Sequence, residues 1–153
     1  MKISVGSDSV SHFVEAICEH LESKGCELQK LGAIAGDTAD YVDAASAVAQ
    51  SVANGESDYG VLFCNTGTGV TIVANKFAGV RAAHCYDTFS AEIAKLANNA
   101  NVLVLSIRYT GERLGKEIVD KWLETAPSTE PRRMTFHRKT DEVDTKLRKE
   151  QQG

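Results

Sequence analysis

The sequence predicts one α/β domain, a three-layer α/β/α structure with a five-stranded parallel sheet. Three observations support this class. Short β-branched segments alternate with longer segments whose apolar residues recur every three or four positions, as in parallel strands covered by helices on both faces. The chain has 153 residues, close to the size of one domain. Its only prolines are Pro127 and Pro131, so no linker interrupts the predicted core over residues 1–126.

The first predicted strand covers residues 2–5 and leads into a helix. The side-chain oxygens of Ser7, Asp8 and Ser9 can cap this helix. Its apolar residues recur at steps of three and four: Val10, Phe13, Val14, Ile17, Cys18 and Leu21. A glycine, Gly25, is expected to end it.

The next elements lead to the most informative junction of the sequence. A second strand is predicted over 27–31, and a turn at 36–37 leads into an alanine-rich helix over 40–53. The third strand, over 59–64, is nearly all apolar, as expected of a strand buried on both faces. It runs directly into the segment N-T-G-T-G at 65–69.

The second half of the core repeats the alternation. The predicted elements are a helix over 70–75, a strand over 80–85, a helix over 88–98, a strand over 102–106 and a helix over 111–125. Residues 127–153 form a basic tail with weak helical character. Because it has little apolar surface of its own, this tail is expected to dock on a partner subunit.

Composition excludes several partners and cofactors. Lys plus Arg total 17 against 21 Asp plus Glu, a formal charge of -4, which lacks the basic footprint that nucleic-acid binding needs. No apolar run approaches the roughly 18 residues that span a bilayer, and no signal-like region is present, so a cytoplasmic protein is expected. The four cysteines form no C-x-x-C pair, and no disulfide, metal or cofactor is predicted.

Open parallel sheets bind ligands at the carboxyl ends of their strands, and the loop 65–69 falls there. It can aim successive backbone N–H groups at an anion, because glycine permits the conformations that such a cradle needs. Glycines in a strand-to-helix turn can equally be conformational only. The spacing matches neither G-x-x-x-x-G-K-[ST] nor G-x-G-x-x-G, the nucleotide-binding patterns.

Cys64 ends the third strand just before this loop. The positive end of a helix dipole there would favour the thiolate, a usable base or nucleophile. The alternative is an inert buried cysteine, since free cysteines are often buried. Cys18 and Cys26 are interpreted as structural, whereas Cys85 ends the fourth strand and could line the site.

Charged residues near the strand ends are further candidates. Asp8 could cap the first helix, hold a substrate hydroxyl, or do both. Arg108 follows the fifth strand and is well placed for a ligand anion. The basic residues of the tail are Arg132, Arg133, Arg138 and Lys139. They suit a phosphate clamp, with a solvated tail as the alternative.

Four motifs occur in order along roughly residues 1–125. They are V-G-S-D-S at 5–9, G-V-L-F-C-N-T-G-T-G-V at 60–70, A-N-K-F-A-G-V-R-A at 74–82 and N-A-N-V at 99–102. Together they resemble the ribose-5-phosphate isomerase B family, which includes the galactose-6-phosphate isomerase subunits. The resemblance implies a Rossmann-like sheet, a homodimer or homotetramer with active sites shared at subunit interfaces, and no metal or cofactor.

The resemblance also implies an aldose–ketose isomerisation through a cis-enediolate. Cys64 matches the base that moves a proton between C1 and C2, and Thr66 matches a hydroxyl near the enediolate oxygens. The amides of residues 67–69 match the oxyanion hole. The substrate-binding candidates are Asp8, Ser9, Asn65, Gly67, Thr68, Gly69, Asn98, Arg108, Arg132, Arg133 and His137.

The sequence departs from this family at three places. Ser9 stands where the family usually has a histidine, and Ala97 stands where its ring-opening histidine falls. The two C-terminal arginines that the family has at i and i+4 are not reproduced, because the pairs here are Arg132 with Phe136 and Arg133 with His137.

Several substrates remain open. Isomerisation of ribose 5-phosphate and ribulose 5-phosphate is the first expectation, with His84, His12 or a partner-chain histidine as the ring-opening acid. A tetrose 4-phosphate cannot close a furanose ring and needs no such acid, so erythrose 4-phosphate and erythrulose 4-phosphate are an alternative. The others are a galactose-6-phosphate isomerase subunit and a non-catalytic sugar-phosphate-binding module.

Overall fold

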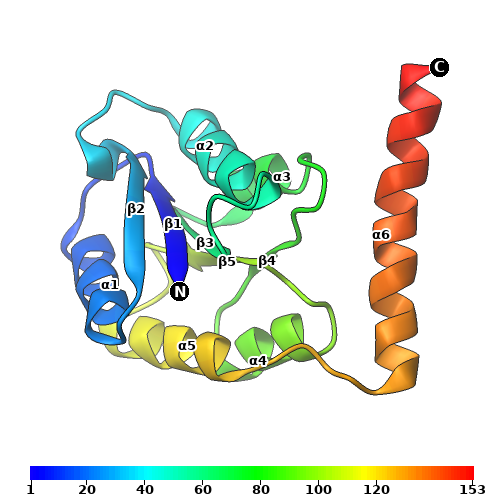
Figure 1. Ribbon diagram of the computed structural model, residues 1–153. Coiled ribbons are helices and arrows are strands. Elements are labelled where there is room, and N and C mark those ends of the chain that lie inside the picture. The colour runs from blue at the N-terminus through cyan, green and yellow to red at the C-terminus, as the bar shows by residue number, and fades with distance from the viewer.

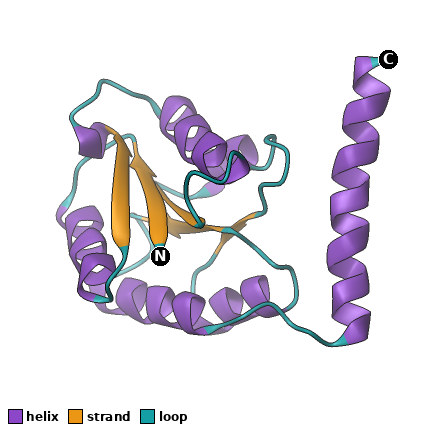
Figure 2. Cartoon of the chain, viewed as in Figure 1, coloured by secondary structure: helices purple, strands orange, loops and turns teal.

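The computed structural model describes all 153 residues and has a three-layer α/β/α body beside a separate C-terminal helix (Figure 1; Figure 2). Five parallel strands form one sheet in the order β2-β1-β3-β5-β4. The strands are β1 (Lys2–Ser7), β2 (Glu27–Gly32), β3 (Tyr59–Cys64), β4 (Ala82–His84) and β5 (Val102–Ser106). The helices are α1 (His12–Ser23), α2 (Tyr41–Ala53), α3 (Thr68–Ala74), α4 (Thr88–Leu96), α5 (Glu112–Glu124) and α6 (Pro131–Gln152), with a short 3-10 helix η1 (Ala33–Ala35). The predicted fold class is confirmed.

Different helices cover the two faces of the sheet. Helices α1, α4 and α5 lie on one face, and α2 and α3 lie on the other (Figure 1). Because successive strand residues point to opposite faces, Phe63 packs into the core under α1 and α5. Its neighbours Leu62 and Cys64 pack into the core under α2 and α3. The side chain of Cys64 therefore belongs to the α2–α3 side of the sheet.

The predicted start of the first helix is wrong. Its cap is Ser11, whose side chain accepts a hydrogen bond from the amide of Val14 at 3.3 Å, and not the cluster at residues 7–9. The Oγ of Ser7 is used inside the loop, where it donates to the carbonyl of Ser9 at 2.7 Å. Val10 consequently lies before the helix and is 59% exposed. The predicted end is confirmed, since Gly25 follows the helix with a φ of +81°.

The fourth strand is shorter than predicted. The amide of Ala82 donates to the side-chain oxygen of Asn75 at 2.8 Å, and the amide of Arg81 donates to that of Asn101 at 2.7 Å. Asparagine side chains thus hold the backbone at the start of β4, which pairs with β5 only over Ala82–His84. The next helix, α4, ends at Leu96 rather than residue 98, and Asn99 then turns the chain with a φ of 51°.

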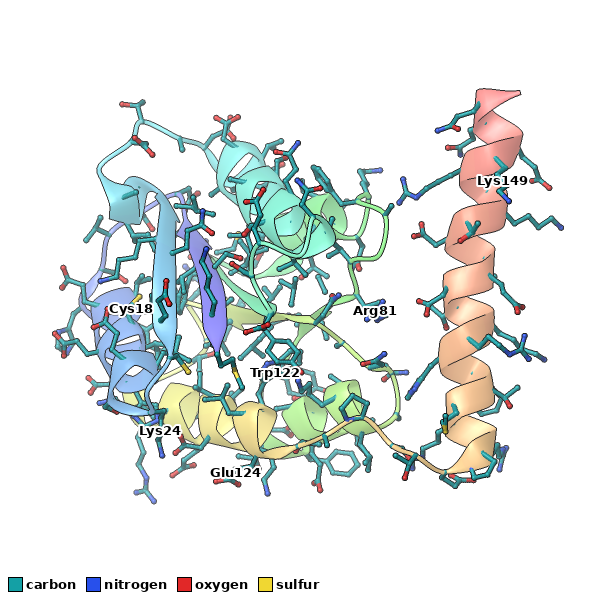
Figure 3. All side chains as sticks on the ribbon, in the orientation of Figure 1. Cys18, Lys24, Arg81, Trp122, Glu124 and Lys149 are labelled. Atoms are coloured by element: carbon teal, nitrogen blue, oxygen red, sulfur yellow. The ribbon has the colours of Figure 1, made fainter.

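Helix α6 stands beside the β4 edge of the body and has no buried residue (Figure 1). Polar contacts attach it: Asp144 accepts from the amide of Gly79 at 2.9 Å, and Asp141 pairs with Arg81 at 3.3 Å. Arg81 lies at the edge of the body on the side of α6 (Figure 3). The tail is thus a 22-residue helix, more regular than the sequence suggests. None of the helices is long and apolar enough to cross a membrane.

Candidate active site

The carboxyl ends of the central strands bring one group of candidate residues together. Cys64 at the end of β3 pairs in register with Ser106 at the end of β5. Hydrogen bonds also connect the segments at the carboxyl ends of β3 and β5. The carbonyl of Asn65 accepts from Ser106 Oγ at 2.7 Å and from the amide of Arg108 at 3.0 Å. This arrangement places the loop 65–69 and Arg108 at one edge of the sheet.

Cys64 is buried beneath this edge. Its side chain is part of the core that contains Val70 and Val104, and the residue is 8% exposed. The helix that follows, α3, has only seven residues, so its dipole is smaller than that of a longer helix. The individual amides of the loop follow Cys64 directly in the chain.

The loop amides are largely left unpaired by the chain. The N–H groups of Gly67 and Gly69 donate to no acceptor of the chain, and that of Thr68 has only a long contact of 3.4 Å to Thr66 Oγ1. Gly67 caps α3 with a φ of +90°, and its carbonyl accepts from Thr71 Oγ1 at 2.7 Å. Such a run of unpaired N–H groups can stabilise negative charge on a bound oxygen. We call the loop 65–69 the cradle.

Two rings lie against the glycines of the loop. A Cβ atom on Gly69 would lie 2.8 Å from Cε2 of Tyr41, and one on Gly67 would lie 2.9 Å from the ring of His84. A side chain is therefore excluded at Gly67 by its φ of +90° and by the ring of His84, and at Gly69 by the ring of Tyr41 alone. The sequence reasoning missed Tyr41. The available signal was its place directly after the cap residue Asp40, at the start of α2.

Asp8, Ser9 and Arg108 complete this group and are all exposed. Asp8 does not cap α1, so that interpretation is corrected, and neither Asp8 nor Arg108 takes part in the ion pairs of the chain. Their charged groups are thus not engaged by any ion pair.

The other predicted binding residues lie at the opposite end of the strands, near the amino end of β5. Asn98, Arg132 and Arg133 line a cavity of about 490 Å³ beside the segment that enters β5. His137 approaches the same segment, with Nε2 2.8 Å from the carbonyl oxygen of Ala97. At about 3.3 Å per residue, the length of β5 puts this end of the strands about 13 Å from Cys64. One chain therefore does not bring the two groups together.

The remaining cysteines do not contribute to the cradle. Cys85 lies in the core on the face opposite to Cys64, where burial raises the pKa of its thiol to about 12. The suggestion that Cys85 lines the site is therefore wrong. Cys18 and Cys26 are buried, as expected of structural cysteines, and burial raises the pKa of both thiols, that of Cys18 to about 11.

Comparison with known proteins identifies the family. A family described as Ribose/Galactose Isomerase matches residues 3–139. The chain belongs to this family. It is 43% identical over 123 residues to ribose-5-phosphate isomerase B of Escherichia coli K12, covering 80% of this chain and 83% of the relative. It is 38% identical over 126 residues to D-erythrulose-4-phosphate isomerase of Pectobacterium atrosepticum, covering 81% and 83%.

A solved structure of the family supports the same conclusion. Ribose-5-phosphate isomerase B of Clostridium thermocellum is 36% identical to this chain, with a TM-score of 0.88, and the match covers 96% of this chain and 99% of that one. The family match at residues 3–139 includes the candidate residues at both ends of the strands.

Proposed function

We propose that this protein is an aldose–ketose isomerase acting on a small sugar phosphate, of the ribose 5-phosphate and ribulose 5-phosphate type. The observation that carries the proposal is the position of Cys64, at the end of a buried strand and directly before a loop with unpaired amides. Membership of the Ribose/Galactose Isomerase family and 43% identity to ribose-5-phosphate isomerase B support it.

In the proposed mechanism, the thiolate of Cys64 removes the proton from C2 of the open-chain aldose. The electron pair of the C–H bond moves to C1–C2, and the carbonyl oxygen becomes the enediolate oxygen. The amides of residues 67–69 stabilise this charge, because donors that are already oriented need no reorganisation. Thr66 Oγ1 passes a proton between the two enediolate oxygens, and Cys64 returns its proton to C1.

Binding of the phosphate requires a second copy of the chain. In one chain, Arg108 lies at the cradle edge, whereas Asn98, Arg132, Arg133 and His137 lie at the opposite end of the strands. A symmetric dimer can bring that end of one copy to the cradle of the other. We infer a homodimer or homotetramer with shared sites, in which α6 docks on the partner. The four free thiols fit a reducing cytoplasm.

A tetrose 4-phosphate is the second candidate substrate. Position 97 has the methyl group of alanine and cannot supply an acid for ring opening, and a tetrose 4-phosphate needs none. The Pectobacterium relative is named for such a substrate. If a pentose phosphate is the substrate, His137 is the candidate for ring opening, because its imidazole contacts the carbonyl of Ala97 in the same chain. His12 instead pairs with Glu112 at 3.0 Å.

The test is kcat/KM of the purified protein with D-ribose 5-phosphate and with D-erythrose 4-phosphate, following ketose formation. A preference for ribose 5-phosphate supports the first substrate, and His137→Ala should then slow it selectively. A preference for D-erythrose 4-phosphate supports the tetrose phosphate as the substrate. Activity with neither directs the search to a galactose-6-phosphate isomerase with a paralogous subunit. Binding of sugar phosphates without turnover would indicate a non-catalytic sugar-phosphate-binding module and contradict the proposed isomerase.

A further inference from the structure

His84 lies against the candidate cradle, and the proposed mechanism gives it no role. It is the last residue of β4 and pairs in register with Val104 of β5. Ala82, two residues earlier, packs with Cys64 and Val104 on the α2–α3 side of the sheet. Because strand residues two apart point to the same face, the imidazole of His84 lies on the side of Cys64.

The edge of the imidazole faces Gly67. A Cβ atom on Gly67 would lie 2.9 Å from Cδ2 and Nε2 of His84 and 3.1 Å from Cε1. These three atoms form the outer edge of the ring. The ring thus fills the space that a side chain at position 67 would need, and it confines the glycine whose φ is +90°.

The nitrogen at this edge has no partner. Nε2 of His84 is fully buried and forms no hydrogen bond. Two nearby carbonyls are already used, since that of Gly67 accepts from Thr71 Oγ1 and that of Asn65 accepts from Ser106 Oγ. An unpaired buried polar atom destabilises a fold. A leucine would avoid this cost, although its branched side chain would not present a flat ring edge to Gly67, so stability alone does not explain a histidine here.

The imidazole is neutral at neutral pH. Burial lowers its pKa from the ordinary 6.5, and no charged residue contributes to the shift. The phenol of Tyr86 lies near it, with ring centroids 6.4 Å apart. Helix α3 and strand β5 contain only uncharged residues. Protonation would therefore put a buried charge without an acceptor beside Gly67.

We propose that His84 is a positioning residue of the isomerase, whose neutral, rigid ring fixes Gly67 and so the direction of the amides of residues 67–69. The inference rests on the proposed function, because that direction matters to the rate only if these amides stabilise an enediolate. Neutral imidazoles beside the reacting oxygens serve other aldose–ketose isomerisations by direct contact. Here the ring acts through the loop.

The first test is His84→Leu. It should lower kcat about ten- to hundredfold, as expected when oriented groups lose their alignment, and leave KM unchanged. Its Tm should equal or exceed that of the wild type, because an unpaired buried nitrogen is removed. Wild-type kcat in this variant, or a lower Tm accompanying the lower kcat, would overturn the proposal.

The second test is the pH dependence of kcat. In the wild type, kcat should fall as the pH drops below 6.5 through the lowered pKa of His84, and stability should fall over the same range because the unfolded chain binds the proton more tightly. His84→Gln should lose the contribution of His84 to this fall, whereas the fall caused by protonation of the Cys64 thiolate should remain. His20→Gln, which removes an imidazole paired with Asp120 at the far end of α1, should keep the wild-type profile. An acid limb in His84→Gln identical to that of the wild type contradicts the proposal.

A third readout separates this inference from the proposed function. Without substrate, the amide NMR signals of Gly67 and Gly69 should shift between pH 7 and pH 5 in the wild type and not in His84→Gln. Signals that do not shift in the wild type overturn the role of His84, whatever Cys64 does. Full activity of Cys64→Ala overturns the proposed mechanism, and the NMR result then still reports on the contact with the loop.

Discussion

Two side chains from distant parts of the sequence confine the cradle glycines. Cys64 and the loop 65–69 could be predicted from the sequence because they are consecutive, and because the strand before them is continuously apolar. The contacts of Tyr41 with Gly69 and of His84 with Gly67 could not, since they depend on how α2 and β4 pack around the loop. No spacing of residues in the sequence predicts these two contacts.

A substitution at Gly67 tests this confinement. Gly67→Ala places a Cβ at a φ of +90° and 2.9 Å from His84. We expect a loss of about 1–3 kcal/mol in the free energy of unfolding and at least about tenfold in kcat, measured by urea denaturation and initial rates. Gly55→Ala is the matched control, because its φ is +73° and nothing lies within 4 Å. Equal losses of stability in both variants would show that the ring does not confine the loop.

At the scale of elements, the prediction succeeded where burial dictates the pattern. The bounds of β3 and β5 agree with the predicted 59–64 and 102–106, because both strands are buried on both faces. The prediction failed where polar side chains determine the bounds of an element, as at the start of α1. The regular structure of α6 was also understated, because charge pairs rather than an apolar stripe support it, such as Arg148 with Asp144 at 2.8 Å.

The cap of α1 gives the prediction at this scale. Ser11→Ala removes the acceptor for the amide of Val14 and should lower the free energy of unfolding by about 1 kcal/mol. Ser9→Ala should leave it nearly unchanged, because Ser9 is held through its backbone N–H and carbonyl. Urea denaturation of both variants decides the matter. A larger loss in Ser9→Ala would restore the cap to residues 7–9.

At the scale of the whole molecule, the candidate residues separate into two groups at opposite ends of the strands of one sheet. The order of residues along the chain carries no information on this separation, which depends on the strand order and on the path of the chain into β5. This separation supports the proposed shared site. In one chain, the loop 65–69 and the cluster of Asn98, Arg132 and Arg133 lie apart.

Mixing two inactive variants tests the shared site. Cys64→Ala keeps the basic cluster, and the double variant Arg132→Ala/Arg133→Ala keeps the cradle. If they are unfolded and refolded together, half of the dimers should be mixed, and each mixed dimer should have one intact site, so activity should recover to about a quarter of the wild type. Variants that stay inactive after mixing, while size-exclusion chromatography shows dimers, would place the whole site within one chain.

The most direct test of the central claim is exchange of the C2 proton of the aldose phosphate with solvent deuterium, followed by NMR. The wild type should introduce deuterium at C1 of the ketose that it forms and at C2 of the aldose that it regenerates, because the thiol proton that Cys64 takes from C2 exchanges with solvent at the enediolate stage. Cys64→Ala should lose this exchange by a factor of at least about 10², whereas Cys26→Ala should retain it. Exchange at the wild-type rate in Cys64→Ala would contradict the account.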